Sequence, residues 1–283
     1  MINISIVLYN APRIQVQLLI NSLTVNPHLN KIYLIDNSET ETTDYKGDHL
    51  HYIFVGKNIG FGAGHNIAMR ESLKDQVVYH LVINYDLKIE ANIIDRLIAK
   101  MEEDKSIGII MPKVLNEDHS VQLSPKLLPT PFYVLFSSFK PFRKLFRKMY
   151  EDYTMKNYLD ITWNLPIITG CFSLFRVSVL SEIGLYDERF FMYFEDDDIS
   201  RRIHCRYKTV YFPEVTIEHA HQRGAAKNIQ LFVIFGTSAI RYFNKHGWIF
   251  DWERYRINRN ILKIAKMKTN EKISTMSHKK MVD

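Results

Sequence analysis

The chain has 283 residues, a formal net charge of +6, 46% hydrophobic and 24% charged residues. This composition excludes an intrinsically disordered chain and is sufficient for one large domain or two small ones. The two cysteines, Cys171 and Cys205, are too few for a disulfide scaffold or a cysteine-based zinc module.

No segment has the length and apolarity expected of a transmembrane helix. Such a helix needs roughly 18–20 apolar residues, whereas the uncharged run at 161–175 is shorter and is broken by Asn164, Pro166 and Gly170. The first eight residues have the pattern of a strand, not of a basic segment followed by an apolar one, so we predict no signal peptide. We therefore expect the protein to stay in the cytoplasm.

The basic residues are concentrated in two segments. Residues 126–148 include six basic side chains and no acidic one, and residues 263–283 include six lysines and two acids, which leaves the rest of the chain net acidic. A nucleic-acid-binding core would instead be expected to have a basic stripe across the fold. The distribution favours contact of the two segments with an anionic surface such as a membrane.

The first 115 residues alternate between predicted strands and helices. Strands are expected at 4–8, 32–35, 52–55, 79–83 and 107–111, with helices at about 12–23, from a glycine-rich turn to about 73, and at 91–101. Strands separated by helices indicate βαβ units and a mainly parallel sheet in an α/β fold.

The second half is less regular. Residues 113–160 form an excursion rich in Pro, Phe and Lys. After it we expect a strand at 167–175, helices at 177–183 and from an acidic run to about 205, a short strand at 209–212, and a helix at 229–245.

Polar residues follow the predicted strands at their carboxyl ends, where open α/β sheets bind ligands. Asp36, Asn58 and Asp86 each lie just past a strand. The carboxylate of Asp86 in Asn84-Tyr85-Asp86 is suited to Mg²⁺ or Mn²⁺ bound to a diphosphate. Taken alone, the same tripeptide is explained more simply as an Asx turn.

A glycine-rich segment joins the third strand to its helix, with Gly60, Gly62 and Gly64 between Asn58 and Asn66. The spacing matches neither the dinucleotide fingerprint nor a P-loop. Close backbone approach to an anionic ligand and a tight turn that needs positive φ explain it equally well.

Four consecutive acids, Glu195 to Asp198, follow five mostly aromatic residues and begin a predicted helix. Acidic residues are favourable at a helix N-terminus for electrostatic reasons alone. Carboxylates beside an apolar wall also tend to have the raised pKa that a general base requires, which favours a catalytic role. Further along, His219, His221 and Arg223 lie in an extended segment, where the two rings point to one side and suit an anionic site, a metal or the core.

Residues 132–149 combine aromatic and basic side chains. From Pro141 onward, Phe142, Leu145, Phe146 and Met149 have helical spacing, and basic residues cover another face. This pattern is typical of an interfacial amphipathic helix, and the lack of acids favours that interpretation over a core-facing helix with a solvated basic face.

Taken in order, five motifs resemble those of inverting family-2 glycosyltransferases of GT-A fold, and most closely their rhamnosyltransferase-like branch. They are Val7-Leu8-Tyr9-Asn10, Ile35-Asp36-Asn37-Ser38, the glycine-rich segment 58–66, Asn84-x-Asp86 and the aromatic–acidic segment 191–198. Residues 219–223 and 239–248 are similar to the C-terminal half of rhamnosyltransferases of bacterial surface polysaccharide (O-antigen or capsule) assembly, so the resemblance covers about residues 1–260.

The resemblance implies roles for individual residues. Asp36 would contact the nucleobase, Asp86 would be the last acid of a metal-binding D-x-D motif with His219 nearby, and Asp196 would be the general base. Glu195 and Asp198 are the alternative catalytic acids, and the further nucleotide-sugar-binding candidates are Tyr9, Asn10, Asn58, Gly60, Gly62, Asn66, Asn84 and Arg223. Asn84 departs from the family pattern, because it replaces the first acid of D-x-D.

The resemblance also implies substrates, a cofactor and a location. We expect a Mg²⁺ or Mn²⁺ ion, dTDP-rhamnose as the first-choice donor, with UDP-galactose or UDP-glucose as alternatives, and a polyprenyl-diphosphate-linked glycan as acceptor. The enzyme would be peripheral at the inner face of the cytoplasmic membrane. Residues 1–115 would bind the nucleotide-sugar, 116–160 the membrane and 161–260 the acceptor, and 261–283 would be a flexible basic tail.

Two other classes remain as alternatives. A sugar-phosphate nucleotidyltransferase should have a glycine-rich loop with Arg and Lys after the first strand, where this chain has Tyr9-Asn10-Ala11-Pro12. A non-catalytic, nucleotide-binding membrane scaffold is supported only by Asn84.

Overall fold

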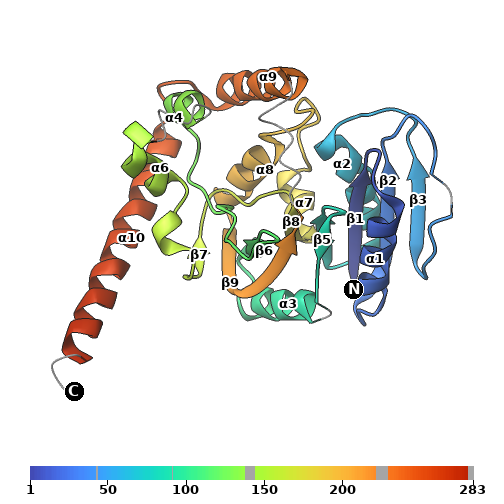
Figure 1. Cartoon of the computed structure of the whole chain (residues 1–283), viewed down its shortest axis with the longest axis horizontal. Coiled ribbons are helices and arrows are strands. Elements are labelled where there is room, and N and C mark those ends of the chain that lie inside the picture. The colour runs from blue at the N-terminus through green and yellow to red at the C-terminus, as the bar shows by residue number, and fades with distance from the viewer. Residues whose placement is uncertain (43, 91, 138–143, 221–228, 280–283) are drawn as a thin grey trace.

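The protein forms one nine-stranded mixed sheet with helices on both faces (Figure 1). The computed structural model describes residues 1–42, 44–90, 92–137, 144–220 and 229–279, with side chains in the last helix described to Met267. The strands follow the order β3-β2-β1-β4-β8-β6-β9-β5, and β7 (Trp163–Asn164) pairs with β9.

The amino-terminal half of the sheet is parallel, as predicted. β1 (Ile2–Leu8) lies between β2 (Leu29–Asp36) and β4 (Tyr79–Ile83), and β3 (Leu50–Phe54) pairs with β2. The connecting helices are α1 (Arg13–Thr24) between β1 and β2, and α2 (Phe61–Asp75) between β3 and β4. A third helix, α3 (Ile93–Glu103), leads to β6. The strand ends that carry the candidate residues therefore meet at one edge of the sheet.

The two faces of β1 differ because successive side chains of a strand point to opposite sides. Ile4 and Ile6 belong to the main apolar core, together with Val16 of α1. Ser5, between them, faces α2 and hydrogen-bonds to His65 at 2.6 Å. The sheet is thus covered by α1 on one face and α2 on the other.

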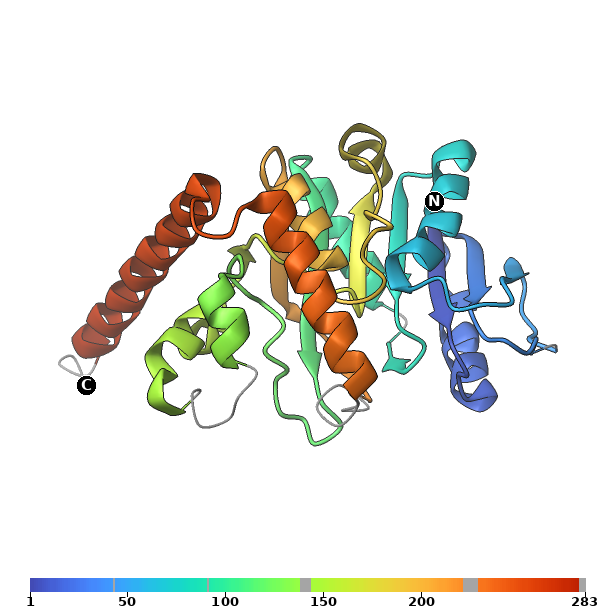
Figure 2. The same cartoon turned by 90° about the horizontal axis from the view of Figure 1, so that it is seen from above.

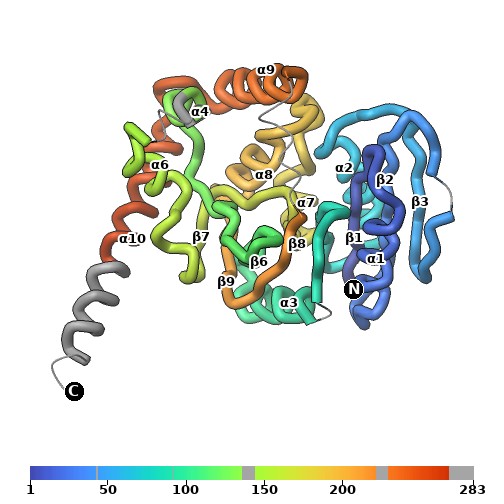
Figure 3. The backbone as a smooth tube through the Cα atoms, in the orientation of Figure 1, coloured from blue at the N-terminus to red at the C-terminus, as the bar shows by residue number. Residues whose placement is uncertain are grey.

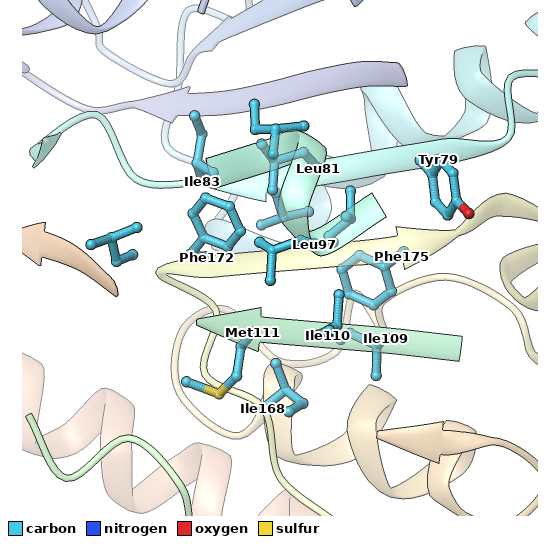
Figure 4. Close-up of a cluster of buried hydrophobic side chains, with 14 of the residues drawn as sticks. Tyr79, Leu81, Ile83, Leu97, Ile109, Ile110, Met111, Ile168, Phe172 and Phe175 are labelled. Carbon is cyan, nitrogen blue, oxygen red and sulfur yellow. The ribbon is translucent and has the colours of Figure 1, made fainter. Parts of the chain in front are cut away.

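The second half of the sheet is mixed: β6 and β9 run parallel to each other, whereas β8 is antiparallel to its neighbours. β6 (Ile107–Leu115) does not follow β4, because β8 (Phe172–Arg176) returns from the 116–171 excursion and pairs antiparallel with both. Figure 4 shows Leu81, Phe172 and Ile110 of these three strands in one apolar cluster. In the sheet, β8 therefore lies between β4 and β6, which are consecutive among the long strands predicted from the sequence.

β9 (Lys208–His219) is longer than the strand expected at 209–212. It pairs in parallel with β6, and its end pairs with the short strand β5 (Leu87–Lys88), so segments far apart in sequence lie side by side (Figure 3). This pairing brings His219 to the segment that follows β4.

The excursion contains α4 (Pro131–Ser137), α6 (Arg147–Tyr153) and a short 3-10 helix, η1 (Lys156–Tyr158). The interfacial helix predicted from Pro141 begins outside the described residues, since 138–143 are not among them. In the part described, Lys144 and Leu145 are helical, a turn follows at Phe146, and α6 then starts at Arg147.

Four helices complete the fold: α7 (Val177–Ile183), α8 (Glu195–His204), α9 (Ile229–His246) and α10 (Trp252–Lys279). In Figures 1 and 2, α9 lies along one side of the molecule beside α8, and α10 extends away from the sheet. Because α10 runs through residue 261, the boundary of a separate tail expected there does not coincide with the end of an element. Among the described residues, no helix is both long and apolar enough to cross a membrane.

Candidate active site

The candidate residues gather where β1, β2 and β4 end. Asn10 follows β1, Asp36 is the last residue of β2, Asp86 follows β4, and His219 is the last residue of β9. The acidic residues at the start of α8 follow the aromatic segment that contacts the glycine-rich turn. Arg223 and His221 lie outside the described residues.

The carboxylate of Asp36 is buried and already oriented. It accepts hydrogen bonds from the Tyr52 hydroxyl at 2.7 Å and from the Ser38 N–H at 2.9 Å. Asn10, in a left-handed conformation with φ of 49°, donates its N–H to the Ser38 hydroxyl at 2.8 Å, and the preceding Tyr9 is half exposed. The ends of β1 and β2 therefore form one pre-ordered corner with an exposed aromatic ring.

The glycine-rich turn packs against the segment before α8. Asn58 accepts the Gly60 N–H at 3.0 Å, and the Phe61 N–H donates to the Phe191 carbonyl at 2.9 Å. Gly60 has a φ of +93°, and a Cβ there would lie 2.2 Å from the Phe191 carbonyl oxygen. A Cβ on Gly62 would lie 2.9 Å from Cβ of Tyr186. Close packing thus explains both glycines.

The side-chain amide of Asn66 is used within the fold. It donates to the Tyr186 carbonyl at 2.9 Å and to Glu188 at 3.0 Å, and it accepts the Tyr186 N–H at 3.0 Å. The residue is buried. Its visible role is to fix the 186–188 loop to α2, which positions the aromatic–acidic segment that follows.

The structure brings Asp86 and His219 together. Asp86 Oδ1 lies 3.2 Å from His219 Nε2, and the Asn84 amide nitrogen lies 3.4 Å from the same ring atom. Gln122 is 3.3 Å from the other ring nitrogen. Burial opposes a charged imidazole, but hydrogen bonds with Asp86 and Cys171 outweigh it and raise the pKa of His219 to about 10.

The spacing of this pair fits a six-coordinate divalent ion, whose binding would release the proton that His219 otherwise carries. Adjacent ligands at about 2.1 Å from an octahedral ion are about 3 Å apart, close to the Asp86–His219 distance. Within the described part of the chain, no group of three or more His, Cys, Asp and Glu side chains could hold a metal. An ion here would therefore depend on diphosphate oxygens for further ligands, as Mg²⁺ commonly does.

Among the four acids that begin α8, Asp196 is held in place by backbone N–H groups. Its Oδ2 accepts the Gly170 N–H at 2.9 Å and its Oδ1 accepts the Asp197 N–H at 3.2 Å. The side chain is only partly buried. Two backbone donors therefore orient a carboxylate whose remaining lone pairs are open to a ligand.

The alternative acids are placed differently. Asp198 is fully buried and binds Arg202, Lys245 and His246 at 2.7–2.9 Å, so its carboxylate is consumed by the fold. Burial, with the neighbouring Asp196 next, raises the pKa of Glu195 well above its usual value. Glu195 is buried and its Oε2 has no hydrogen-bond partner among the described residues. Asp198 is therefore engaged within the fold, and burial favours the neutral form of Glu195, so neither is placed as a free base.

The turn before α8 sets the direction in which the acidic start of that helix projects. Tyr193 and Phe194 have φ values of 69° and 66°, an uncommon left-handed pair for non-glycine residues. Phe194 packs against Tyr242 and Phe243 of α9 in a separate apolar cluster. The aromatic wall that precedes the acids is therefore made jointly by this turn and by α9.

Several contacts of the site were not predicted from the sequence. Tyr52 orients Asp36, Gln122 contacts His219, and Lys245 and His246 bind Asp198. None belongs to a local motif, because each partner is distant in the sequence; only pairing of the strands and docking of α9 bring them together.

A family model described as "Glycosyl transferase family 2" matches residues 4–184. The chain belongs to this family. The matched region includes the ends of β1, β2 and β4 and the glycine-rich turn, whereas Asp196 and His219 lie beyond it.

Curated relatives are similar at low identity. This family 2 glycosyltransferase is 23% identical over 240 residues, 77% of its chain and 76% of the relative, to N-acetylglucosaminyl-diphospho-decaprenol L-rhamnosyltransferase of Mycobacterium tuberculosis. It is 29% identical over 177 residues to the low-salt glycan biosynthesis hexosyltransferase Agl10 of Haloferax volcanii, covering 60% of this chain and 52% of that one.

Solved structures establish the GT-A fold of this glycosyltransferase. One is S. aureus TarS 1-349 in complex with UDP-GlcNAc, with a TM-score of 0.57, 11% identity and coverage of 92% of this chain and 71% of that chain. Another is GalNAc-T7 with UDP, GalNAc and Mn²⁺, with a TM-score of 0.55, 15% identity and coverage of 79% and 44%. The chain thus spans less than half the length of the second structure.

Proposed function

We propose that this glycosyltransferase moves L-rhamnose from dTDP-rhamnose to a hydroxyl of a lipid-linked oligosaccharide in bacterial surface polysaccharide assembly, with inversion at the anomeric carbon. The observation that carries the proposal is the similarity to the mycobacterial L-rhamnosyltransferase over three quarters of both chains. That relative's name specifies a diphospho-decaprenol acceptor, which supports a lipid-linked acceptor here.

The donor would lie across the carboxyl ends of β1, β2 and β4. Asp36 would accept a hydrogen bond from the nucleobase, beside the half-exposed ring of Tyr9. Asp86 and His219 would hold Mg²⁺ or Mn²⁺, which when bound offsets charge on the departing nucleoside diphosphate. In this assignment residues 1–115 form the donor half and residues 161–260 the acceptor half.

Asp196 would accept the proton of the attacking acceptor hydroxyl. Its carboxylate is oriented by the Gly170 and Asp197 N–H groups and is partly exposed, while Asp198 is bound to Arg202, Lys245 and His246. A base on the acceptor side allows one in-line displacement at the anomeric carbon, and that step inverts the configuration. No covalent sugar–enzyme intermediate is needed.

A UDP-hexose is the second candidate donor. Agl10 is named a hexosyltransferase, and TarS was solved with UDP-GlcNAc, so galactosyl or glucosyl transfer from a UDP-sugar stays open. A nucleotidyltransferase or a non-catalytic scaffold is disfavoured by the family match and by the pre-oriented Asp196.

The donor is tested by thermal shift with dTDP-rhamnose, UDP-galactose and UDP-glucose, each with and without Mn²⁺, because a ligand that binds the native state raises its melting temperature. We expect the largest shift with dTDP-rhamnose and Mn²⁺. The best donor is then incubated with N-acetylglucosaminyl-diphospho-polyprenol, and the anomeric configuration of the product is read by NMR. A larger shift with a UDP-sugar would replace the donor, and a retained configuration would contradict the mechanism.

A further inference from the structure

Helix α9 is apolar on two sides. One side, with Ala239, Tyr242 and Phe243, packs against Phe190 and Phe194. A neighbouring side faces solvent, with Phe232 59% and Ile240 52% exposed.

The exposed apolar residues form one stripe. At 100° per residue, positions 229, 232, 233, 236 and 240 fall within an arc of roughly 100°. In the turn that follows α9, Ile249 and Phe250 are also exposed, at 80% and 86%. We call the exposed side chains of Ile229, Phe232, Val233, Ile240, Ile249 and Phe250 the α9 ridge.

Among the described residues, no other element covers the ridge. Figure 1 shows α9 along the upper edge of the molecule, and Figure 2, which looks from above, shows none of the described elements over it. A Cβ on Gly236, in the middle of the stripe, would have no atom within 4 Å. The ridge therefore exposes apolar surface that the described fold does not use.

The surroundings of the ridge are cationic. Residues 229–267 include seven basic side chains and two acidic ones. Of the basic ones, Lys245 pairs with Asp187 and Asp198, and Arg254 pairs with Asp251. On α10, Arg256, Arg259, Lys263 and Lys266 are exposed. Apolar side chains flanked by unopposed cations are what an anionic bilayer surface binds.

The ridge is also tied to the candidate base. Ser238 donates to the Met192 carbonyl at 2.8 Å, and Lys245 binds both Asp187 and Asp198 at 2.7 Å. These contacts link α9 to both ends of the aromatic–acidic segment. A surface that anchors α9 would hold Asp196 close to that surface.

We propose that the α9 ridge inserts into an anionic membrane and is the main membrane contact of this protein. The sequence had suggested residues 132–149 and the tail for that contact. The inference builds on the proposed lipid-linked acceptor, because insertion of α9 would bring the acceptor half to the bilayer where such a lipid lies. Membrane binding itself needs neither donor nor acceptor, so it is testable even if the proposed reaction is wrong.

The test is co-sedimentation of the full chain with vesicles of phosphatidylglycerol and phosphatidylcholine, without substrates. The ridge variant combines Phe232→Glu and Phe250→Glu. The matched control combines Ile14→Glu and Leu18→Glu on α1, which are 76% and 64% exposed on another part of the molecule. All four positions are exposed, and melting temperature and nucleotide-diphosphate binding check that each variant is folded.

We expect the partition coefficient of the ridge variant to fall at least about tenfold. Two apolar side chains that would insert into the bilayer are removed, and the two glutamates that replace them are repelled by the anionic lipid. The control should stay within about twofold of wild type. Wild type should retain part of its binding at high salt, since insertion of apolar side chains is not screened.

Tryptophan fluorescence gives an independent readout. Trp248 and Trp252 are exposed beside the ridge, whereas Trp163 is buried. A blue shift on adding vesicles, quenched by brominated lipids and absent in the ridge variant, would support insertion. Equal vesicle binding by wild type and ridge variant would overturn the proposal. So would a wild-type dimer that the ridge variant splits without any loss of vesicle binding, because the ridge would then be a contact between two copies.

Discussion

At the residue scale, the dependence of donor binding on a metal tests whether Asp86 and His219 hold an ion. Asp86→Ala removes the only carboxylate of the pair, since Asn84 is neutral. We expect the affinity for a nucleoside diphosphate with Mn²⁺, measured by calorimetry, to fall at least about tenfold, and EDTA to reduce wild-type affinity to the same level.

The matched control is Asp160→Ala, which removes an exposed carboxylate whose salt bridge joins it to Lys113. It should leave nucleotide affinity and its EDTA dependence unchanged. Wild-type affinity that is indifferent to both EDTA and Asp86→Ala would show that no metal acts at this pair.

Asp197 gives a pH-dependent prediction. Burial first, and the nearby Asp196 second, raise the pKa of Asp197 to about 7 in the folded protein. In the unfolded chain an aspartate titrates near 3.9. Below pH 4 the group is protonated in both states, whereas between pH 4 and 7 only the unfolded state ionises, so folding loses stability as pH rises.

Asp197→Asn removes this titration and should therefore stabilise the protein increasingly from pH 4 to pH 7. We expect the gain to level off at about 1–2 kcal/mol, less than the full shift implies because the side chain is partly exposed. Urea unfolding of both proteins at several pH values measures it. A stability difference that does not change with pH would contradict the assignment.

At the element scale, the turn before α2 and the segment before α8 depend on each other. Gly60→Ala would place a methyl group 2.2 Å from the Phe191 carbonyl oxygen at a φ of +93°. We expect a loss of unfolding free energy of at least about 2 kcal/mol, together with reduced turnover, because the segment carrying Asp196 must shift.

Gly236→Ala is the control for this prediction. It lies inside α9 with no atom within 4 Å of the added methyl group, so it should stabilise by about 0.5–1 kcal/mol. Chemical denaturation compares the two variants with wild type. If Gly60→Ala is as stable and as active as wild type, the two segments are not coupled in this way.

The same elements explain how much could be predicted from the sequence. β4 and α7 were predicted residue for residue, and β1 and β2 to within a few residues, because their apolar runs are compact and end at polar residues. The position of β8 could not be predicted, since a local pattern does not reveal which strand it pairs with. The 3.2 Å approach of Asp86 to His219 rests on the pairing of β5 with β9, which the sequence did not predict. Only the family resemblance implied that His219 lies near the metal site.

At the scale of the whole molecule, α9 takes part in both proposed functions, glycosyl transfer and membrane contact. Its inner side completes the aromatic wall and binds Asp198, and its outer side carries the ridge. In the proposed mechanism the parallel half of the sheet would bind the donor, and α8 would supply the base. Transfer would therefore take place between the proposed nucleotide site and a lipid-facing helix.

The most direct test of this account compares wild type with Asp196→Asn in transfer of rhamnose from dTDP-rhamnose to a polyprenyl-diphosphate-linked acceptor, followed by mass spectrometry. The substitution keeps the shape of the side chain and removes its ability to take a proton. We predict that turnover falls at least about a hundredfold while nucleoside-diphosphate affinity stays within a few-fold of wild type. Near-normal transfer by Asp196→Asn would contradict the assignment of Asp196 as the base.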